Sequence, residues 1–283
     1  MLDLGPGDPS RRRALRTMVG IGVGTATGLA APLWIEERHA LAVTRVDVPL
    51  AALPAALDGL RIGVLTDIHR SAMVSRDHVE RAVGLLNAER PDLVLLGGDY
   101  VSYGDRTLAE SVVDSLTGLV APHGVFAALG NHDEGAALPA TFARRGMAVL
   151  ADAVAQLSIR RTPLEVIGVR FWTRDARRIG TLAGSSPAFK ILLAHDPRRV
   201  TEASEVGIPL VVSGHTHGGQ VVLPVFGAVA ARRFPVIAGL ARHEGGATVY
   251  VSRGVGTVYV PVRANCPPEV NVLTLRQQPL VTG

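Results

Sequence analysis

The stretch Leu60-Arg61-Ile62-Gly63-Val64-Leu65-Thr66-Asp67 is a short apolar run that ends in a carboxylate. Such a run fits a β-strand that is buried on both faces. The same pattern returns from Asp92 to Leu96, before Gly97-Gly98-Asp99, and from Gly124 to Leu129, before Gly130-Asn131. The first half of the chain therefore predicts three buried strands, each followed by a polar side chain.

Helical spacing separates these strands. Apolar residues recur on one face in the segments 77–89, 107–119 and 138–145. In the second half, the segments 154–160 and 164–169 predict neighbouring strands with a turn at Arg161-Thr162-Pro163. Further strands are predicted at 189–195, 209–213, 248–251 and 269–275, and a helix at 197–206. The alternation predicts an α/β fold.

Polar residues gather at the ends of these predicted strands. In open α/β sheets, ligands collect at the carboxyl ends of the strands. We therefore expect five strand ends to meet at one site and to deliver Asp67, Asp99, Asn131, His195 and His215.

Two short motifs add further ligands. In an extended chain alternate side chains point the same way, so Asp67-Ile68-His69 would place two ligands on one side, and His215-Thr216-His217 would place two imidazoles there. A set of nitrogen and oxygen ligands without thiolate suits Mn, Fe or Zn.

The predicted ligands are too many for one ion and fit two ions that share a carboxylate, for which Asp99 is the candidate. Two adjacent metals activate water near neutral pH and hold the attacking and leaving oxygens of a phosphoryl transfer. His132 faces away from its neighbour Asn131 and is a candidate general acid. Asp133 either orients His132 or caps the following helix.

These motifs, with Gly98-Asp99 and Gly130-Asn131-His132-Asp133 in this order, resemble the calcineurin-like metallophosphoesterase superfamily from about Leu60 to Gln220. The resemblance implies two stacked mixed β-sheets flanked by helices, a four-layer sandwich. It also implies that one metal is held by Asp67, His69 and His217 and the other by Asn131, His195 and His215, with Asp99 between them and His132 as the acid.

The C-terminal segments 253–256 and 261–269 resemble one bacterial subgroup, whose members are membrane-associated or exported by the twin-arginine route. The leading functional hypothesis is hydrolysis of a phosphomonoester or phosphodiester by metal-activated hydroxide. The alternative is a pyrophosphatase acting on a lipid-linked or nucleotide-sugar substrate such as UDP-diacylglucosamine, with an apolar groove formed by Ala52 to Leu57 or Leu223 to Val229. A non-catalytic metal-binding scaffold is the third hypothesis.

The N-terminus predicts export. Arg11-Arg12-Arg13 precedes a nearly uncharged stretch from Thr17 to Ile35, and Ala40-Leu41-Ala42 resembles a cleavage site. We expect residues 1–42 to be a twin-arginine-type signal, or an uncleaved signal anchor, and residues 43–283 to form the phosphoesterase domain outside the cytoplasm. The expected partners are the twin-arginine translocase, a membrane surface and the phosphoester substrate.

Charge balance and cysteine content say less about function than the motifs do. The 283 residues carry 29 Lys and Arg against 25 Asp and Glu, and no basic run is interleaved with aromatics, so nucleic acid is not an expected partner. The lone Cys266 excludes an internal disulfide. Arg70, next to His69, is a candidate contact for substrate phosphate, and a solvated surface arginine is the alternative.

Overall fold

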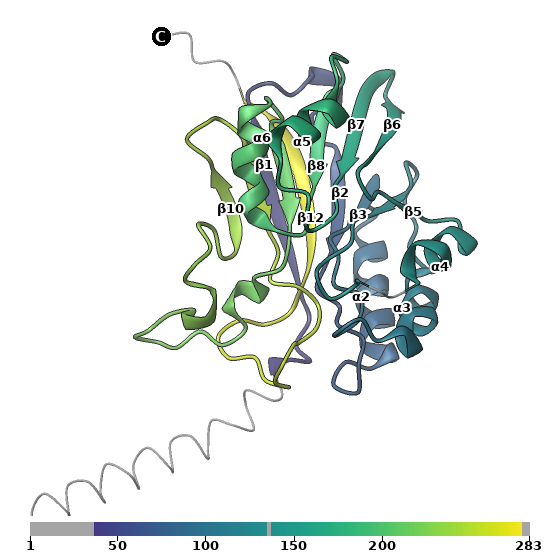
Figure 1. Ribbon diagram of the computed structural model, residues 1–283, viewed down its shortest axis with the longest axis vertical. Helices are drawn as coiled ribbons and strands as arrows, with labels where there is room; N and C mark the ends of the chain where they lie inside the picture. The colour runs from purple at the N-terminus through teal and green to yellow at the C-terminus, as the bar shows by residue number, and fades with distance from the viewer. Residues whose placement is uncertain (1–36, 135–136, 279–283) are drawn as a thin grey trace, which may run out of the picture.

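Two six-stranded mixed β-sheets pack face to face, and helices cover the outer face of each sheet (Figure 1). This computed structural model describes residues 37–134 and 137–278. The layers run helix, sheet, sheet, helix, which confirms the expected sandwich of two mixed sheets flanked by helices.

The first sheet has the order β1-β12-β2-β3-β4-β5. All neighbouring strands in it are parallel except β12 and β2, which are antiparallel. Its strands are β1 (Ala42–Leu50), β2 (Arg61–Leu65), β3 (Leu93–Leu96), β4 (Val125–Ala127), β5 (Ala148–Val149) and β12 (Glu269–Gln277).

The second sheet has the order β10-β11-β9-β8-β7-β6. Its four central strands, β11, β9, β8 and β7, are parallel to one another, and the two edge strands are antiparallel to their neighbours. Its strands are β6 (Ala153–Ile159), β7 (Thr162–Gly168), β8 (Phe189–Leu193), β9 (Leu210–Ser213), β10 (Gly239–Arg242) and β11 (Thr248–Val251).

Helices form because each presents one apolar face to a sheet. In α2, for example, Ser75 caps the N-terminus by accepting a hydrogen bond from the His78 N–H, and Val79, Val83 and Leu86 are buried. The first sheet carries α2 (Arg76–Ala88), α3 (Ala109–Leu116) and α4 (Leu138–Arg144), and the second carries α5 (Ala176–Ala183) and α6 (Val200–Glu205). Short 3₁₀ turns are η1 (Ala55–Leu57), η2 (Arg106–Leu108), η3 (Pro197–Arg199), η4 (His217–Gly219) and η5 (Val229–Ala231).

The core between the sheets fixes how they face each other. It is formed by apolar side chains from the inner faces of both sheets, with Ile62 and Leu95 from one and Val166 and Leu193 from the other. Leu57 of η1 is fully buried in the same core. Of the segment Ala52 to Leu57, considered as one wall of an apolar groove, Leu53 and Leu57 are therefore buried in this core, while its three alanines are exposed.

Four local elements differ from expectation. The hairpin between β6 and β7 turns at Arg160 and Arg161, because Ile159 pairs with Thr162, and Pro163 lies inside β7. The short strands β5 and β10 and the helix α5 were not predicted. For α5 the sequence does hold signals, since Asp175 accepts a hydrogen bond from Arg177 N–H as the N-cap and Gly184 ends the helix.

Residues 1–36, which hold most of the expected signal, lie outside the described residues. The chain is part of the folded body from Glu37 onward, since the Glu37 carboxylate accepts hydrogen bonds from the N–H groups of Asn265 and Cys266. Arg38 donates to the Met73 carbonyl. Among the helices in residues 37–134 and 137–278, none has the length and apolar character needed to cross a membrane.

The tight turn between β6 and β7 generates a stability prediction. Arg161 is exposed and has φ of 64°, a left-handed conformation that glycine adopts without strain. Arg161→Gly is expected to raise the free energy of unfolding by about 0.5–1 kcal/mol, measured by urea denaturation. The control Arg161→Ala removes the same side chain but keeps the strain, so equal stability of the two variants would contradict the argument.

Candidate metal centre

Six of the seven predicted ligands form two groups at the meeting point of the sheets. The first group is Asp67, His69 and His217, and the second is Asp99, His195 and His215; within each group the ligand atoms lie within 4.8 Å of one another. All of these side chains follow β2, β3, β8 or β9 directly or within a few residues. The structure thus brings these six side chains together at the strand ends, and their role as ligands stays a prediction.

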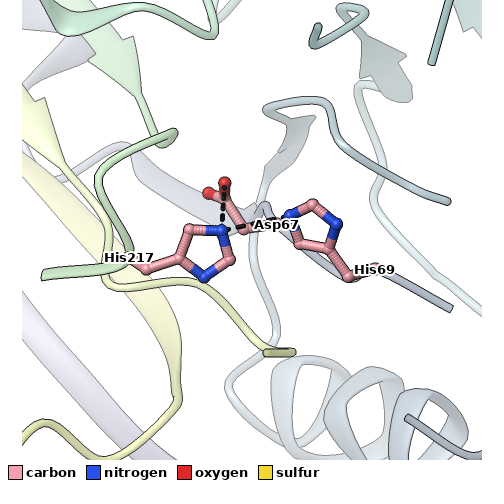
Figure 2. Close-up of side chains that lie close together, drawn as sticks. All are labelled: Asp67, His69 and His217. Atoms are coloured by element: carbon pink, nitrogen blue, oxygen red, sulfur yellow. Dashed lines mark hydrogen bonds and ion pairs between the residues drawn. The ribbon is translucent and has the colours of Figure 1, made fainter. Parts of the chain in front are cut away.

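The first group is compact (Figure 2). The Nε2 atoms of His69 and His217 lie 3.1 Å apart, and His217 Nε2 lies 3.3 Å from Asp67 Oδ1. All three side chains are buried. Two imidazole nitrogens and a carboxylate oxygen therefore point at one small volume.

The second group meets the first at Asp99. Asp99 Oδ2 lies 3.1 Å from His195 Nε2 and 3.5 Å from His69 Nε2, so one carboxylate oxygen contacts both groups. Asn131, the seventh predicted ligand, lines the same cavity as Asp99 and His215. Its side-chain oxygen is buried and has no hydrogen-bond partner.

These residues fit bound cations. A buried amide oxygen without a partner is costly unless something satisfies it, and nitrogen lone pairs 3.1 Å apart repel each other unless a proton or a cation lies between them. The donors are imidazole, carboxylate and amide, with no thiolate, which is the set that suits Mn, Fe or Zn.

Burial sets the charge states of the ligands. It lowers the pKa of His69 and of His215 to about 3, so both imidazoles are neutral and offer a lone pair at neutral pH. It raises the pKa of Asp67 to about 6. Burial would also lower the pKa of His195, but the adjacent Asp99 carboxylate outweighs it and raises that pKa to about 10, so this ring has to lose its Nε2 proton before it can bind a cation.

Backbone strain concentrates at the ligands. Asp67, His69, Asp99, His215 and His217 all have φ between 48° and 72°, the left-handed region that residues other than glycine seldom adopt. The expectation of extended ligand motifs is therefore wrong. Asp67 and His69 do converge, but through two left-handed residues.

The two histidines of the His215-Thr216-His217 motif diverge instead. His217 joins the first group and His215 the second, so the motif contributes one imidazole to each. The division agrees with the ligand assignment that the family resemblance implied.

Two motif glycines are required by close packing. A Cβ at Gly130 would lie 2.1 Å from Asp99 Oδ1, and one at Gly214 would lie 2.2 Å from Asp67 Oδ2. Any side chain at either position would displace a ligand carboxylate. Glycine therefore precedes Asn131 and His215 for steric reasons.

Hydrogen bonds orient the imidazoles. His195 Nδ1 lies 2.7 Å from the Gly97 carbonyl, which accepts its hydrogen and leaves Nε2 as the ligand atom. His69 Nδ1 lies 3.2 Å from the Ser102 hydroxyl, so Ser102 contacts a ligand ring.

His132 lines the cavity beside the two groups. Its Nδ1 accepts a hydrogen bond from the Tyr103 backbone N–H at 3.0 Å. In the neutral ring the hydrogen is therefore on Nε2, the atom left to serve a substrate oxygen.

Asp133 holds the backbone of the site. Its two oxygens accept hydrogen bonds from the N–H groups of Asp99, Tyr100 and Gly130 at 2.8 Å, and from that of Val101 at 3.4 Å. Neither sequence interpretation of Asp133 matches this geometry, because His132 Nδ1 is occupied by Tyr103 and the N-cap of α4 is Ala137. Asp133 instead joins the loop after β3 to the loop after β4.

Sequence reasoning missed Arg263 as a structural group. Its guanidinium is fully buried and donates to the carbonyls of Arg253, Gly256 and Cys266 at 2.7, 2.6 and 3.0 Å. The loop that it holds covers Asp67, since Val255 N–H donates to the Thr66 carbonyl and Gly256 N–H to the Asp67 carbonyl. Its place in a Pro-Val-Arg segment gave no signal of burial.

Arg70 is half-buried, and its Nη1 donates to the carbonyls of Ser71 and Val74 at 2.6 and 2.8 Å. Its contact with substrate phosphate stays a prediction.

A sandwich of two mixed sheets that gathers carboxylate and imidazole ligands at its strand ends defines a metal-dependent phosphoesterase. The model of the family described as "Calcineurin-like phosphoesterase" matches residues 60–219, more than half of the chain, and the chain belongs to this family. It is accordingly a hydrolase of phosphoric esters.

Known relatives cover nearly the whole chain. The chain is 29% identical to an uncharacterized metallophosphoesterase, YkuE, of Bacillus subtilis, across 94% of this chain and 98% of the relative. It is 30% identical to the phosphodiesterase YaeI of Escherichia coli, across 94% and 99%. It is 27% identical to a bovine transmembrane protein with metallophosphoesterase domain, across 96% of this chain and 65% of that protein.

The two groups generate a prediction about metal content. The purified full chain is expected to bind about two divalent ions, measured by elemental analysis after dialysis. His217→Ala and His215→Ala should each lose about one ion, because they belong to different groups, and Asp99→Ala should lose both. One ion in the unaltered protein, or loss of the same ion in both histidine variants, would contradict this arrangement.

Proposed function

We propose that this protein is an exported hydrolase that uses two metal ions to cleave phosphomonoesters or phosphodiesters. The observation that carries the proposal is the meeting of the two ligand groups at Asp99 Oδ2, which lies within 3.5 Å of a histidine from each. Metals bound there would activate water and neutralise charge on the phosphoryl oxygens. The name of the E. coli relative, a phosphodiesterase, supports the same reaction class.

The protein's own residues would bind the metals, protonate the leaving group and position the loops of the site. Asp67, His69 and His217 would hold one cation, and His195, His215 and Asn131 would hold the other, with Asp99 available to both. His132 presents its Nε2 hydrogen to the leaving oxygen, while Tyr103 N–H fixes the ring. Asp133 keeps the loops that carry Asp99 and Asn131 in register.

The proposal that the protein is exported rests on its N-terminal sequence. Paired arginines ahead of an uncharged stretch of about 20 residues are typical of a twin-arginine signal, and a retained signal would anchor the body at a membrane. The name of the bovine relative, a transmembrane protein, supports membrane association. The twin-arginine translocase is the proposed export partner.

A cavity of about 450 Å³ supports the second candidate, a lipid-linked or nucleotide-sugar pyrophosphate as substrate. One end of the cavity holds the metal centre and the rest is lined mainly by apolar side chains, among them Leu223 and Val229 of the segment considered as a groove. An apolar cavity next to a phosphate site fits an acyl chain better than it fits a second polar group.

The loss of activity on removing His132 should depend on the leaving group of the substrate. His132→Ala is expected to keep its metal and to lose about 10²-fold or more in kcat on alkyl phosphate esters, whose leaving oxygen needs a proton. The loss on 4-nitrophenyl esters should be much smaller, because nitrophenolate leaves without one. His123→Ala, a histidine before β4, is the matched control. An equal loss on both ester types would remove His132 from this role.

The apolar cavity generates a prediction about substrate preference. With Mn or Zn bound, kcat/KM is expected to be at least tenfold higher for phosphodiesters or pyrophosphates that carry a fatty acyl chain than for short-chain analogues, measured below the critical micelle concentration. Leu223→Asp should remove this preference and leave turnover of short esters unchanged. A chain-length profile that is flat in the unaltered protein would exclude the lipid-linked candidate.

A further inference from the structure

Two loops form the apolar side of the cavity. The first follows the metal-binding turn and includes Val221, Leu223 and Phe234, and the second includes Val258 and Val260. Gln220 joins them, because its amide group donates to the carbonyls of Val258 and Val260 and accepts from the Val258 N–H. The two loops therefore form one continuous wall.

The outer edge of this wall is apolar and faces water. Val225 is 86% exposed, Tyr259 69% and Phe226 63%. Eight large hydrophobic side chains are exposed in residues 37–134 and 137–278, and five of them lie in these two loops. We call these five the apolar rim; they are Val225, Phe226, Val229, Tyr259 and Val260. Water-facing apolar side chains gathered around a cavity mouth indicate a binding surface.

The charge of the two loops indicates what the rim binds. The segments 221–243 and 254–268 contain no aspartate or glutamate, while Arg232 and Arg233 next to the rim are exposed. A surface of apolar side chains with arginine and without acidic residues is complementary to anionic lipid headgroups over an acyl layer.

The course of the chain supports a lipid rather than a protein partner. In sequence, the uncharged stretch 17–35 is followed by Glu36 and Glu37, and Glu37 is hydrogen bonded to Asn265 and Cys266. Asn265 in turn donates to the Val222 carbonyl, at the base of the first loop. The described chain thus begins beside the loops that carry the rim.

We propose that the apolar rim docks onto the surface of an anionic lipid bilayer, so that the cavity opens toward the membrane interface. This orientation goes beyond the proposed reaction and does not depend on it. An amphiphile held in the bilayer would reach the metal centre along the apolar wall without passing through water.

A depth probe on the rim tests the proposal in the full chain. Phe226→Cys is labelled with a nitrobenzoxadiazole dye and mixed with vesicles of phosphatidylglycerol and phosphatidylethanolamine that carry a nitroxide on the lipid chain. Native Cys266 is only 2% exposed and should not react. We expect severalfold quenching of the dye at position 226. Val120→Cys, a valine that is 68% exposed beyond α3, is the matched control and should stay unquenched.

This readout separates the rim from the N-terminal stretch. If the protein sediments with the vesicles but the dye at position 226 is not quenched, the chain is held by another segment and the proposal is overturned. Equal quenching at positions 226 and 120 would also overturn it, as would self-association of the chain without vesicle binding. Replacing phosphatidylglycerol with phosphatidylcholine should reduce quenching, because the arginines lose their anionic partners.

A paired variant checks that the rim and the reaction are separate. Val225→Asp with Phe226→Asp places two charges on the rim, and neither residue lines the cavity. We expect vesicle binding through the rim to fall at least tenfold while turnover of a water-soluble ester stays the same. Unchanged quenching of a dye at position 260 in this variant would contradict the proposal. If the unaltered protein hydrolyses no ester at all, that result would contradict the proposed function and leave the docking proposal in place.

Discussion

Neither sheet of this protein carries a complete group of candidate metal ligands. The first group of ligands takes Asp67 and His69 from the first sheet and His217 from the second, while the second group takes Asp99 from the first sheet and His195 and His215 from the second. The geometry of both groups therefore depends on the apolar core between the sheets. Close packing makes that core resistant to small shifts, which keeps ligands from opposite sheets in place.

The surrounding packing also explains why strained backbone and buried charged residues are tolerated near the ligands. Five ligands have left-handed backbone, and such conformations persist only where the surrounding structure enforces them. Asp133 and Arg263 supply much of that enforcement, since each binds several backbone groups of loops that carry or cover ligands. Both are buried charged residues whose hydrogen-bonding groups meet backbone partners, which is how proteins accommodate buried polar groups.

The sequence allowed the sheets and the ligands to be predicted for one reason. An apolar run that ends abruptly at Asp, Asn or His carries both the strand and its functional end, so Asp67, Asp99 and His195 could be placed together. The backbone at those residues could not be predicted, because no glycine or proline signals a left-handed aspartate or histidine. The two-residue strand β5 is too short for any periodicity, and the role of Arg263 depends on carbonyls brought together by the fold.

The pairing of β1 with β12 has a consequence for how the protein is made. The strand at residues 42–50 lies at the edge of its sheet, and its neighbour there is the strand at residues 269–277. A ribosome produces the first strand long before its partner exists, and contacts between such distant residues form slowly. The Gly254–Gly256 loop over Asp67 is held by Glu269, which begins that last strand. The loop over Asp67 can therefore close only after the strand at residues 269–277 has been made.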